Sequence, residues 1–561
     1  MWFLFGMKIK DRKQKSWGGP FTPTHIPHSS GRAIRCKSAP LRVHPLAGFS
    51  LLSLAEALAK LSANIPALCG FAFRNRTISN VAFLASPTIG QTALHEIVRM
   101  VETFNLKNSL SSLANTQLMQ RLLFLLLTLL IGCSQKDSRP RTWQSIEKSL
   151  QTQLITVADG DTVHLPEGHF MFTKSLTMDG KKNVVIQGKG MDKTILSWKN
   201  QTEGAEGMHI SNSKNILLTA FSVEDAKGDN LKVNDTQGIT FRKVRSAWAD
   251  GPKTENGAYA LYPVLCTRVI IEDCIAMGSS DAGIYVGQSD TVIIRYNKAY
   301  WNVAGIEAEN SRWVEIYGNE ANHNTGGILV FDLPGLNKYG HTTKVFKNNI
   351  HDNNHKNFAQ KGNIVASIPP GSGMMILATH DIDVFDNDIV NNRTVGVAVV
   401  SYELVAALNK EEVQQEGSIG GVQTVDNRYQ EDSLYNAFPY NVTVRDNRFK
   451  NSHWFPSIGN DIGKLLITKS FMATPDVLYD GIENPKQKER GICVGDNGKI
   501  TFINLDAAND FKSLSKDVAP FACKKLSAGL AEVGSKQLSF ATHYAIDYAK
   551  AKSVKKATED K

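Results

Sequence analysis

A repeat of 22 residues in the middle of the chain constrains the fold more than any other feature. Three segments align without gaps, and each contains a glycine followed by an isoleucine; the glycines are Gly283, Gly305 and Gly327. Between them the pattern V-x-I-x-x-N ends at Asn297 and again, 22 residues later, at Asn319. A fixed period of this length is typical of a solenoid, in which each unit packs only against its neighbours.

The residues inside each repeat favour strands over helices. Apolar and polar residues alternate over short runs bounded by Gly and Asn. A leucine-rich repeat has a similar period, but Leu329 is the only leucine between Val269 and Val330. We therefore predict an all-β fold, a right-handed parallel β-helix (pectin-lyase-like) with three short strands in each coil and small β-branched side chains stacked inside.

The repeated asparagines predict a structural ladder at one turn of the coil. The pattern returns further along the chain, which gives the series Asn297, Asn319, Asn348, Asn387 and Asn447. Asparagine amides stacked in successive coils can hydrogen-bond along the stack. We expect these side chains to point inward, together with Ile284, Ile306 and Ile328.

The chain divides into six parts by its composition and pattern. The β-helix is expected at 155–455, with roughly ten coils, and a capping helix within 142–150 covers its first coil. A small mixed region follows at 456–530, and a charged tail occupies 531–561. The remaining parts are an extension at 1–118, an apolar segment at 119–132 and a linker at 133–154.

The apolar segment has the features of a lipoprotein signal peptide. Arg121 precedes a run of apolar residues that ends Leu-Ile-Gly-Cys133, and this run is too short to span a bilayer comfortably. Its end resembles the lipobox of bacterial lipoproteins, in which the cysteine is acylated. We expect lipidation at Cys133, translation that begins at Met119, and residues 1–118 to be a mis-annotated extension. The alternative is a genuine extension with an internal anchor.

Charge argues against a nucleic-acid partner. Residues 1–118 contain 14 basic and 4 acidic residues, which leaves 49 basic and 50 acidic residues in the rest of the chain. The body is therefore nearly neutral and offers no general phosphate-binding surface. In an exported protein Cys493 and Cys523 could form a disulfide, whereas Cys266 and Cys274 are expected to be buried thiols.

Two stretches carry a family resemblance. The segment "SIEKSLQ…GDTVHLPEGHFMFTKSLTM…NVVIQGKG" resembles the N-terminal part of pectin-lyase-like β-helix proteins. The segments "NGAYALYPV…SSDAGIYVGQS…NVAGIEAENS…NTGGILVFDLPG" and "RGICVGDNGKITFINLDAANDF" are similar to bacterial parallel β-helix repeat lipoproteins of unknown activity. The resemblance covers roughly 140–525. It implies a companion exported protein as a partner, and a lipid-anchored location at the outer membrane or in the periplasm of a Gram-negative bacterium.

One face of the third strand is the predicted binding surface. If the repeated isoleucines point inward, Tyr285 and Glu307 point outward on neighbouring coils, and Tyr262 extends this column. Aromatic faces stack on sugar rings, and carboxylates bind hydroxyls or a cation such as Ca²⁺. The alternative is ordinary filling of the outer face. The residues expected to bind an extended polysaccharide are Tyr285, Gln288, Asn310 and Asp332.

Insertions after several strands, at about 251–257, 333–342, 352–372 and 403–440, would wall a groove beside this face. In a uronate lyase or epimerase, a base removes a proton next to a neutralised carboxylate. Lys253 is a candidate base, Tyr262 a candidate proton donor and Glu307 a third candidate catalytic residue. Asp250, Asp281, Glu309 and His323 are further acid–base candidates. The Asp-Pro-His-Asp motif of alginate epimerases and the calcium-binding aspartates of pectate lyases are absent, so enzymatic activity stays an open question.

Two other functions compete with polysaccharide binding or processing. The first is a non-catalytic scaffold that docks the companion exported protein. The second is periplasmic copper delivery, for which the candidate ligands would be His323, His341, His351, His355, His380, Met374 and Met375. Surface histidines without a metal are the simpler interpretation of this set, because chelating pairs with tight spacing are lacking.

Overall fold

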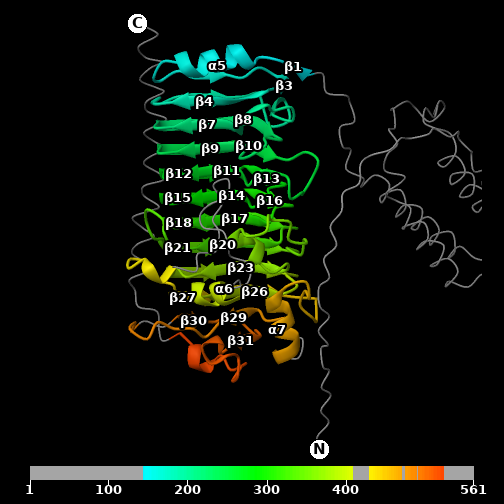
Figure 1. The fold of residues 1–561 in the computed structure, drawn as a ribbon, viewed down its shortest axis with the longest axis vertical. Helices are drawn as coiled ribbons and strands as arrows, with labels where there is room; N and C mark the ends of the chain where they lie inside the picture. Colours follow the sequence, from blue (N-terminus) through cyan, green and yellow to red (C-terminus); the bar gives the residue numbers. More distant parts are fainter. Residues whose placement is uncertain (1–142, 409–428, 471–473, 489–490, 524–561) are drawn as a thin grey trace, which may run out of the picture. The chain divides into compact units, whose positions relative to one another are not determined.

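The computed structural model describes residues 143–408, 429–470, 474–488 and 491–523. The strands lie in successive coils along one axis, from α5 at one end to β31 near the other (Figure 1). All inter-strand pairs in both described sheets are parallel, and each coil contributes to three stacks. The parallel β-helix predicted from the sequence, with three strands in each central coil, is confirmed.

Two stacks make up a 20-stranded sheet and share the long strands β8 and β10. The first stack contains β2 (Thr162–His164), β5 (Val185–Gln187), β8 (Lys214–Glu224), β10 (Gln237–Ala247), β12 (Thr267–Glu272), β15 (Asp290–Arg295), β18 (Arg312–Tyr317), β21 (His341–Phe346), β24 (His380–Phe385), β27 (Tyr440–Arg445) and β30 (Ile492–Val494). The second contains β1 (Trp143–Gln144), β3 (Gly168–Met171), β6 (Thr194–Ser197), β13 (Ile275–Met277), β16 (Lys298–Tyr300), β19 (Glu320–Asn322), β22 (Asn349–His351), β25 (Asp388–Val390) and β28 (Arg448–Lys450).

The third stack is a separate 11-stranded sheet. It contains β4 (Lys174–Asp179), β7 (Glu203–Ser211), β9 (Leu231–Asn234), β11 (Tyr259–Val264), β14 (Ala282–Gly287), β17 (Ala304–Glu309), β20 (Gly326–Phe331), β23 (Ser372–Leu377), β26 (Val395–Val400), β29 (Val477–Tyr479) and β31 (Phe502–Asn504). The helices are α5 (Glu147–Thr156), α6 (Tyr402–Leu408) and α7 (Asp461–Ser470), with short 3₁₀ turns at Ile364–Ser367, Tyr429–Glu431, Ala507–Asn509 and Ala519–Phe521.

The interior of the coils is a continuous apolar column. Ile284, Ile306 and Ile328 are paired in register and have no exposed surface, as the alternation predicts. Cys266 and Cys274 are buried free thiols, also as expected. Both sheets continue past residue 455 through β29, β30 and β31, so part of the segment expected to form a mixed region extends the solenoid.

The asparagine ladder is confirmed, and a second ladder runs beside it. Asn297, Asn319, Asn348, Asn387 and Asn447 are buried and bond amide to amide, and the series continues to Asn497. A second buried series of Asn302, Asn324, Asn353 and Asn392 borders the other end of the second stack, and its amides are linked by hydrogen bonds of 2.9 to 3.1 Å. The regular five-residue spacing between the two series was the signal for this second ladder in the sequence.

The repeated glycines are explained by the second ladder. A Cβ atom on Gly305 would lie 2.6 Å from the carbonyl oxygen of Gly327 and 2.7 Å from Nδ2 of Asn324. A Cβ atom on Gly283 or on Gly327 would lie equally close to its neighbours. The coils therefore approach each other at this corner to a distance that only glycine permits.

Replacing Asn319 by Ala is expected to destabilise the protein by about 2–4 kcal/mol. Its amide oxygen accepts hydrogen bonds from N and Nδ2 of Asn297, and its Nδ2 donates to Ile294 O and Asn348 Oδ1. The substitution leaves several buried polar groups without partners, each of which costs about 1–3 kcal/mol. Urea unfolding would measure the change, with the exposed Asn349→Ala as control. Equal stability of Asn319→Ala and the control would contradict a structural role for the ladder.

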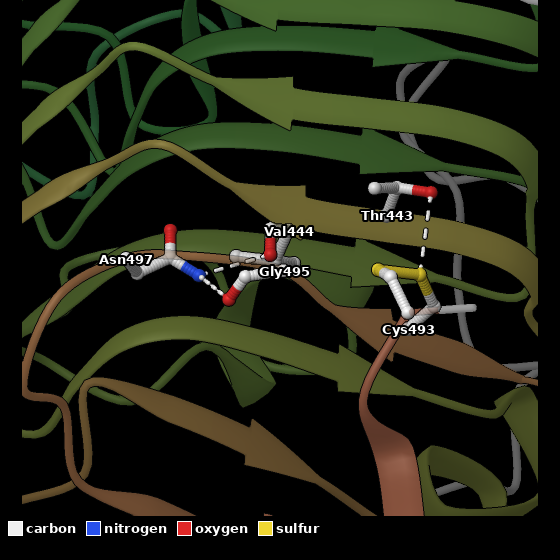
Figure 2. The surroundings of a disulfide bond; sticks show 6 residues. Thr443, Val444, Cys493, Gly495 and Asn497 are labelled. Atoms are coloured by element: carbon white, nitrogen blue, oxygen red, sulfur yellow. Dashed lines mark hydrogen bonds between the residues drawn. A yellow bond between two sulfur atoms is a disulfide. The ribbon is translucent and has the colours of Figure 1, made fainter. Parts of the chain in front are cut away.

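Both ends of the solenoid are covered. At the first end α5 lies later than predicted, at Glu147–Thr156, and its Gln151 side chain exchanges two 2.9 Å hydrogen bonds with the backbone of Thr177, so it satisfies part of the free edge of β4. At the other end Cys493 pairs with Cys523, as expected for this pair (Figure 2). Cys523 N also donates to Val494 O at 3.1 Å.

Candidate active site

The candidate site lies on the outer face of the 11-stranded sheet. The column predicted from the sequence forms as expected: Tyr285 pairs with Glu307, and the rings of Tyr262 and Tyr285 are 5.0 Å apart. Toward the first coils the same column continues with Lys232 and then His209. The predicted outward direction of Tyr262, Tyr285 and Glu307, and their alignment in one column, are therefore confirmed.

The expected exposure of this face is wrong. Tyr262 is 7% exposed, Tyr285 4% and Glu307 1%. Toward the last coils a second apolar cluster covers the sheet, built by Leu329 and Phe331 with residues of the loop around Ile364–Ser367 and of α6. The column is thus a cluster of buried polar groups beside an apolar cluster, and its residues do not form a flat stripe on an open sheet.

Three tyrosines pack together at the centre of this cluster. Tyr259 lies 4.5 Å from Tyr262 and 4.3 Å from Tyr285 between ring centroids. The Tyr285 hydroxyl donates a 2.8 Å hydrogen bond to Glu309 in the next coil. Gly287 makes this possible, because a Cβ atom there would lie 2.4 Å from the Tyr285 hydroxyl. The phenol groups are therefore aimed at the carboxyl groups of β17 and its neighbours.

Three carboxyl groups belong to the same cluster as the tyrosines. Asp281, Glu307 and Glu309 are each at most 2% exposed. Oδ1 of Asp281 and Oε2 of Glu307 are buried, and neither has a hydrogen-bond partner in the described part of the chain. A buried polar atom without a partner is costly, and such atoms concentrate at sites that bind or react.

Burial raises the pKa of these carboxyl groups, and the charges of neighbouring carboxyl groups add to the shift for Asp281 and Glu307. Burial raises the pKa of Glu309 to about 7, and it raises the pKa of Asp229, one coil earlier, to about 7. The pKa of Glu307 is well above its ordinary value because of burial and the nearby charges of Asp281 and Glu309. Asp281 has a raised pKa for the same reasons. The raised pKa values favour the neutral carboxylic acids in this site, and a neutral acid can donate protons and hydrogen bonds.

These pKa shifts predict a stability that falls as pH rises. A carboxyl group whose pKa is raised by folding contributes its full stability below the ordinary pKa near 4, and this contribution is lost as pH rises to about 7. Glu309→Gln removes one such group. The difference in melting temperature between this variant and the native protein should therefore shift in favour of the variant from pH 5 to pH 8. The shift corresponds to about 2–3 kcal/mol in the free energy of unfolding. A difference that does not change with pH, measured by calorimetry, would contradict the buried protonated state.

Three of the predicted substrate-binding residues hold a loop. The amide of Asn310 bonds to Leu333 N, Leu333 O and Lys338 O at 2.8 to 2.9 Å. Gln288 accepts a hydrogen bond from the backbone N of Asn337, and Asp332 accepts one from Gly340. Their polar side chains are thus used to fix the segment 333–340 against the sheet. Tyr285, the fourth predicted substrate-binding residue, lies in the cluster of tyrosines and carboxyl groups.

Lys253 lies apart from the other predicted catalytic residues. Its Nζ is 3.4 Å from Asp250 in an exposed loop, and no hydrogen bond or ion pair between described residues connects it to Tyr262 or Glu307. His323 is also elsewhere, stacked against Trp301 at 5.2 Å. The cation that does lie in the column is Lys232, whose Nζ is 5.1 Å from the centre of the Tyr262 ring and 3.5 Å from Glu206.

The structure gives no support for a metal site. Among the described residues, no group of three or more His, Cys, Asp or Glu side chains is arranged to hold a metal ion. Met374 is in the interior of the coils, and His341 stacks on His380 at 5.5 Å.

Sequence reasoning did not include Asp229, Lys232 or Tyr259 in the site. All three precede the strict 22-residue repeats, where the coils contain insertions, so their register with Tyr285 was not visible. The pairing of Leu261 with both Leu231 and Ile284 now places them. No helix within the described ranges is long and apolar enough to cross a membrane. Cys133 and residues 1–118 lie outside the described residues.

Comparison with known proteins agrees with this architecture. The family model described as the right handed beta helix region matches residues 172–332 and 250–409. This match agrees with the parallel β-helix fold of the described residues, which the sequence predicts. No curated protein matches the chain.

Three of the solved structures to which this chain is similar are two epimerases and DFA-IIIase. The A-module of mannuronan C-5 epimerase AlgE4 from Azotobacter vinelandii is 14% identical and has a TM-score of 0.36, with 63% of this chain and 90% of that chain covered. A mutant of the periplasmic alginate epimerase AlgG is 12% identical, with a TM-score of 0.32 and coverage of 56% and 80%. DFA-IIIase from Arthrobacter chlorophenolicus A6 is 9% identical, with a TM-score of 0.33 and coverage of 57% and 84%.

Proposed function

We propose that this protein binds and processes an extended polysaccharide at the cluster of tyrosines and carboxylic acids on the 11-stranded sheet. The observation that carries the proposal is the buried Glu307, whose Oε2 has no hydrogen-bond partner among the described residues while it lies next to Tyr285. Tyrosine rings supply faces for sugar rings, and the acids supply proton donors. The column of coils gives these groups the linear arrangement that a polymer matches.

The chemistry that fits this cluster is acid–base catalysis on an acidic sugar, as in a uronate lyase or epimerase. A neutral carboxylic acid at Glu307 or Asp281 donates a hydrogen bond to the substrate carboxylate, and this stabilises negative charge that develops when the neighbouring carbon loses its proton. Lys232, in its neutral form, takes the place of Lys253 as the candidate base that accepts this proton, because it lies in the same column. Tyr262 and Tyr285 are the candidate donors that return a proton to the sugar.

The test is incubation of the chain from Ser134 onward with a panel of acidic and neutral polysaccharides. Ultraviolet absorbance detects the unsaturated products of a lyase, and proton NMR detects epimerised or shortened chains. We expect a product or a tight complex with at least one acidic polymer. If no polymer is changed and none raises the melting temperature, the proposal is wrong, and a scaffold for the companion exported protein becomes the better hypothesis.

We also propose that the protein is exported and anchored by lipid at Cys133. The signal-like segment 119–132 and the Cys493–Cys523 disulfide support this proposal, because disulfides persist in oxidising compartments. Mass spectrometry of membrane fractions should find a mature N-terminus at an acylated Cys133. A peptide from residues 1–118 in the native protein would contradict it.

A further inference from the structure

Two exposed aromatic residues flank the short strand β16 in the middle coils (Figure 1). Tyr296 comes before this strand and is 56% exposed, and Trp301 follows it and is 39% exposed. Since Ala299 points into the apolar interior, Lys298 and Tyr300 point outward between them. The outer face of β16 and its two turns thus presents aromatic rings at both ends and hydrogen-bonding groups in the middle.

Both aromatic residues have a left-handed backbone, which is costly for a large side chain. The φ angle is 58° at Tyr296 and 62° at Trp301. In the neighbouring coils these turn positions are mostly Asp, Asn or Gly, which adopt this conformation more easily. They are Asp273, Gly318, Lys347, Asp386 and Asp446 at the position of Tyr296, and Gly278, His323, Asp352 and Asn391 at that of Trp301. One coil therefore departs from the turn chemistry of its neighbours at both turns, and such departures are concentrated at functional sites.

The ring of Trp301 is held from two sides. The His323 ring of the next coil lies against it, with 5.2 Å between ring centroids and 30° between the planes, and His355 meets it edge-on at 5.6 Å. In the preceding coil the same turn position is Gly278, which has no side chain to stack on the indole. The indole is thus positioned by its neighbours and still exposed, which lowers the entropy cost of binding a ligand there.

The ring of Tyr296 lies over a glycine. A Cβ atom on Gly318 would be 2.7 Å from Cδ1 and Cε1 of Tyr296, so a side chain at this position would displace the ring. The Tyr317 ring packs against it at 5.7 Å and 84°, and the Arg295 guanidinium is 5.8 Å from its centre. This ring is therefore also positioned by its neighbours while it stays largely exposed.

The polar groups between the two rings balance each other's charge. Lys298 Nζ is 3.1 Å from a carboxylate oxygen of Glu320 in the next coil, and Glu320 is also 3.4 Å from Nε2 of His351. A sugar ring has an apolar C–H face, which stacks on an aromatic ring, and hydroxyl groups at its edge, which need donors and acceptors. The core of a protein–protein contact would instead be depleted of charged residues. Separated rings with paired polar groups between them therefore favour a sugar ligand.

We propose that the outer face of β16, with Tyr296 and Trp301, is a carbohydrate-binding surface separate from the proposed active site. It holds a polysaccharide by stacking on its sugar rings, while the polar side chains between the two aromatic residues bind hydroxyl groups. The inference shares its class of ligand with the proposed function but none of its residues, and it needs no reaction at Glu307. Because its charges are balanced, the surface accepts neutral as well as acidic polymers.

The test is affinity electrophoresis of the full chain in native gels that contain hydroxyethylcellulose, xylan, polygalacturonate or alginate. We expect at least one polymer to retard the protein, with a dissociation constant that changes little between low and high salt. Trp301→Ala and Tyr296→Ala should each weaken binding about tenfold, which corresponds to the loss of one aromatic stacking contact. Trp454→Ala is the matched control, because Trp454 is 82% exposed but lies in the loop between β28 and α7. It should bind as the native protein does.

Tyr296→Phe separates binding from folding, because it keeps the ring and should keep the affinity that Tyr296→Ala loses. Thermal melting checks each variant, and this pair decides the test if Trp301→Ala is unstable. Unchanged affinity in both alanine variants overturns the inference and leaves the proposed function intact; the exposed rings would then be a contact for a protein partner. Loss of binding in Glu307→Gln alone also overturns it, since all binding would then be at the proposed active site. Absence of binding to all four polymers overturns the inference as well, whereas product formation tests the proposed function separately.

Discussion

Replacing Glu307 by Gln is expected to lower polysaccharide processing by about 10²–10³-fold without loss of stability. The substitution keeps the shape of the side chain and removes the acidic proton, and single acid–base or charge-stabilising groups contribute rate factors of this size. Because the native carboxyl group is buried and one of its oxygens has no partner in the described structure, the amide is expected to leave stability at pH 7 unchanged or slightly higher. Turnover on the polymer found by the panel measures the first effect, and thermal melting the second.

Glu315→Gln is the matched control for this prediction. Glu315 is also buried, with a pKa raised by burial, but it lies on the outer face of β18 in the other sheet. Its replacement should leave both binding and turnover unchanged. If Glu307→Gln retains full activity while Tyr285→Phe does not, the proton donor is the tyrosine and the role given to Glu307 is wrong.

Replacing Ile306 by Asp should prevent the central coils from folding. Ile306 has no exposed surface and is paired between Ile284 and Ile328 in the interior column. A carboxylate there would lose its hydration with no partner, at a cost of several kcal/mol, which is a large share of the stability of most proteins. The control, Ile306→Val, removes one methylene group and should cost only about 0.5–1.5 kcal/mol. Circular dichroism and urea unfolding would distinguish the two.

A cooperative, native-like unfolding transition for Ile306→Asp would contradict the inward assignment. The location of the defect along the solenoid is also informative, because each coil contacts only the coils beside it. We expect the defect to be strongest in the coils of β14, β17 and β20, and to be weaker near α5. Hydrogen exchange followed along the chain would measure this gradient.

The fold could be predicted from the sequence because its determinants are local and repeated. Each coil repeats an inward isoleucine, a turn asparagine and a corner glycine, and each of these has one physical reason that the structure bears out. The same periodicity gave the direction of Tyr285 and Glu307. The disulfide between Cys493 and Cys523 was also expected, but the tail predicted to hold both cysteines was wrong for Cys493, which lies in β30 of the solenoid.

The environment of the site could not be predicted, because it depends on the insertions. Nothing in the repeat indicates that segment 333–340 folds back and uses the side chains of Gln288, Asn310 and Asp332. Burial by such loops changes Glu307 from an expected surface carboxylate into a neutral acid. The irregular coils before Tyr285 likewise concealed Asp229 and Lys232, whose positions follow only from the strand pairing.

The equal length of the central coils has a consequence for how this protein can diverge. Duplication of one 22-residue unit before Tyr285 would keep both asparagine ladders and the corner glycines in register. The solenoid would gain one coil, about 4.8 Å along its axis, while the side chains of β14 and β17 kept their neighbours. Relatives of this protein can therefore differ in length by whole coils and keep the same packing inside.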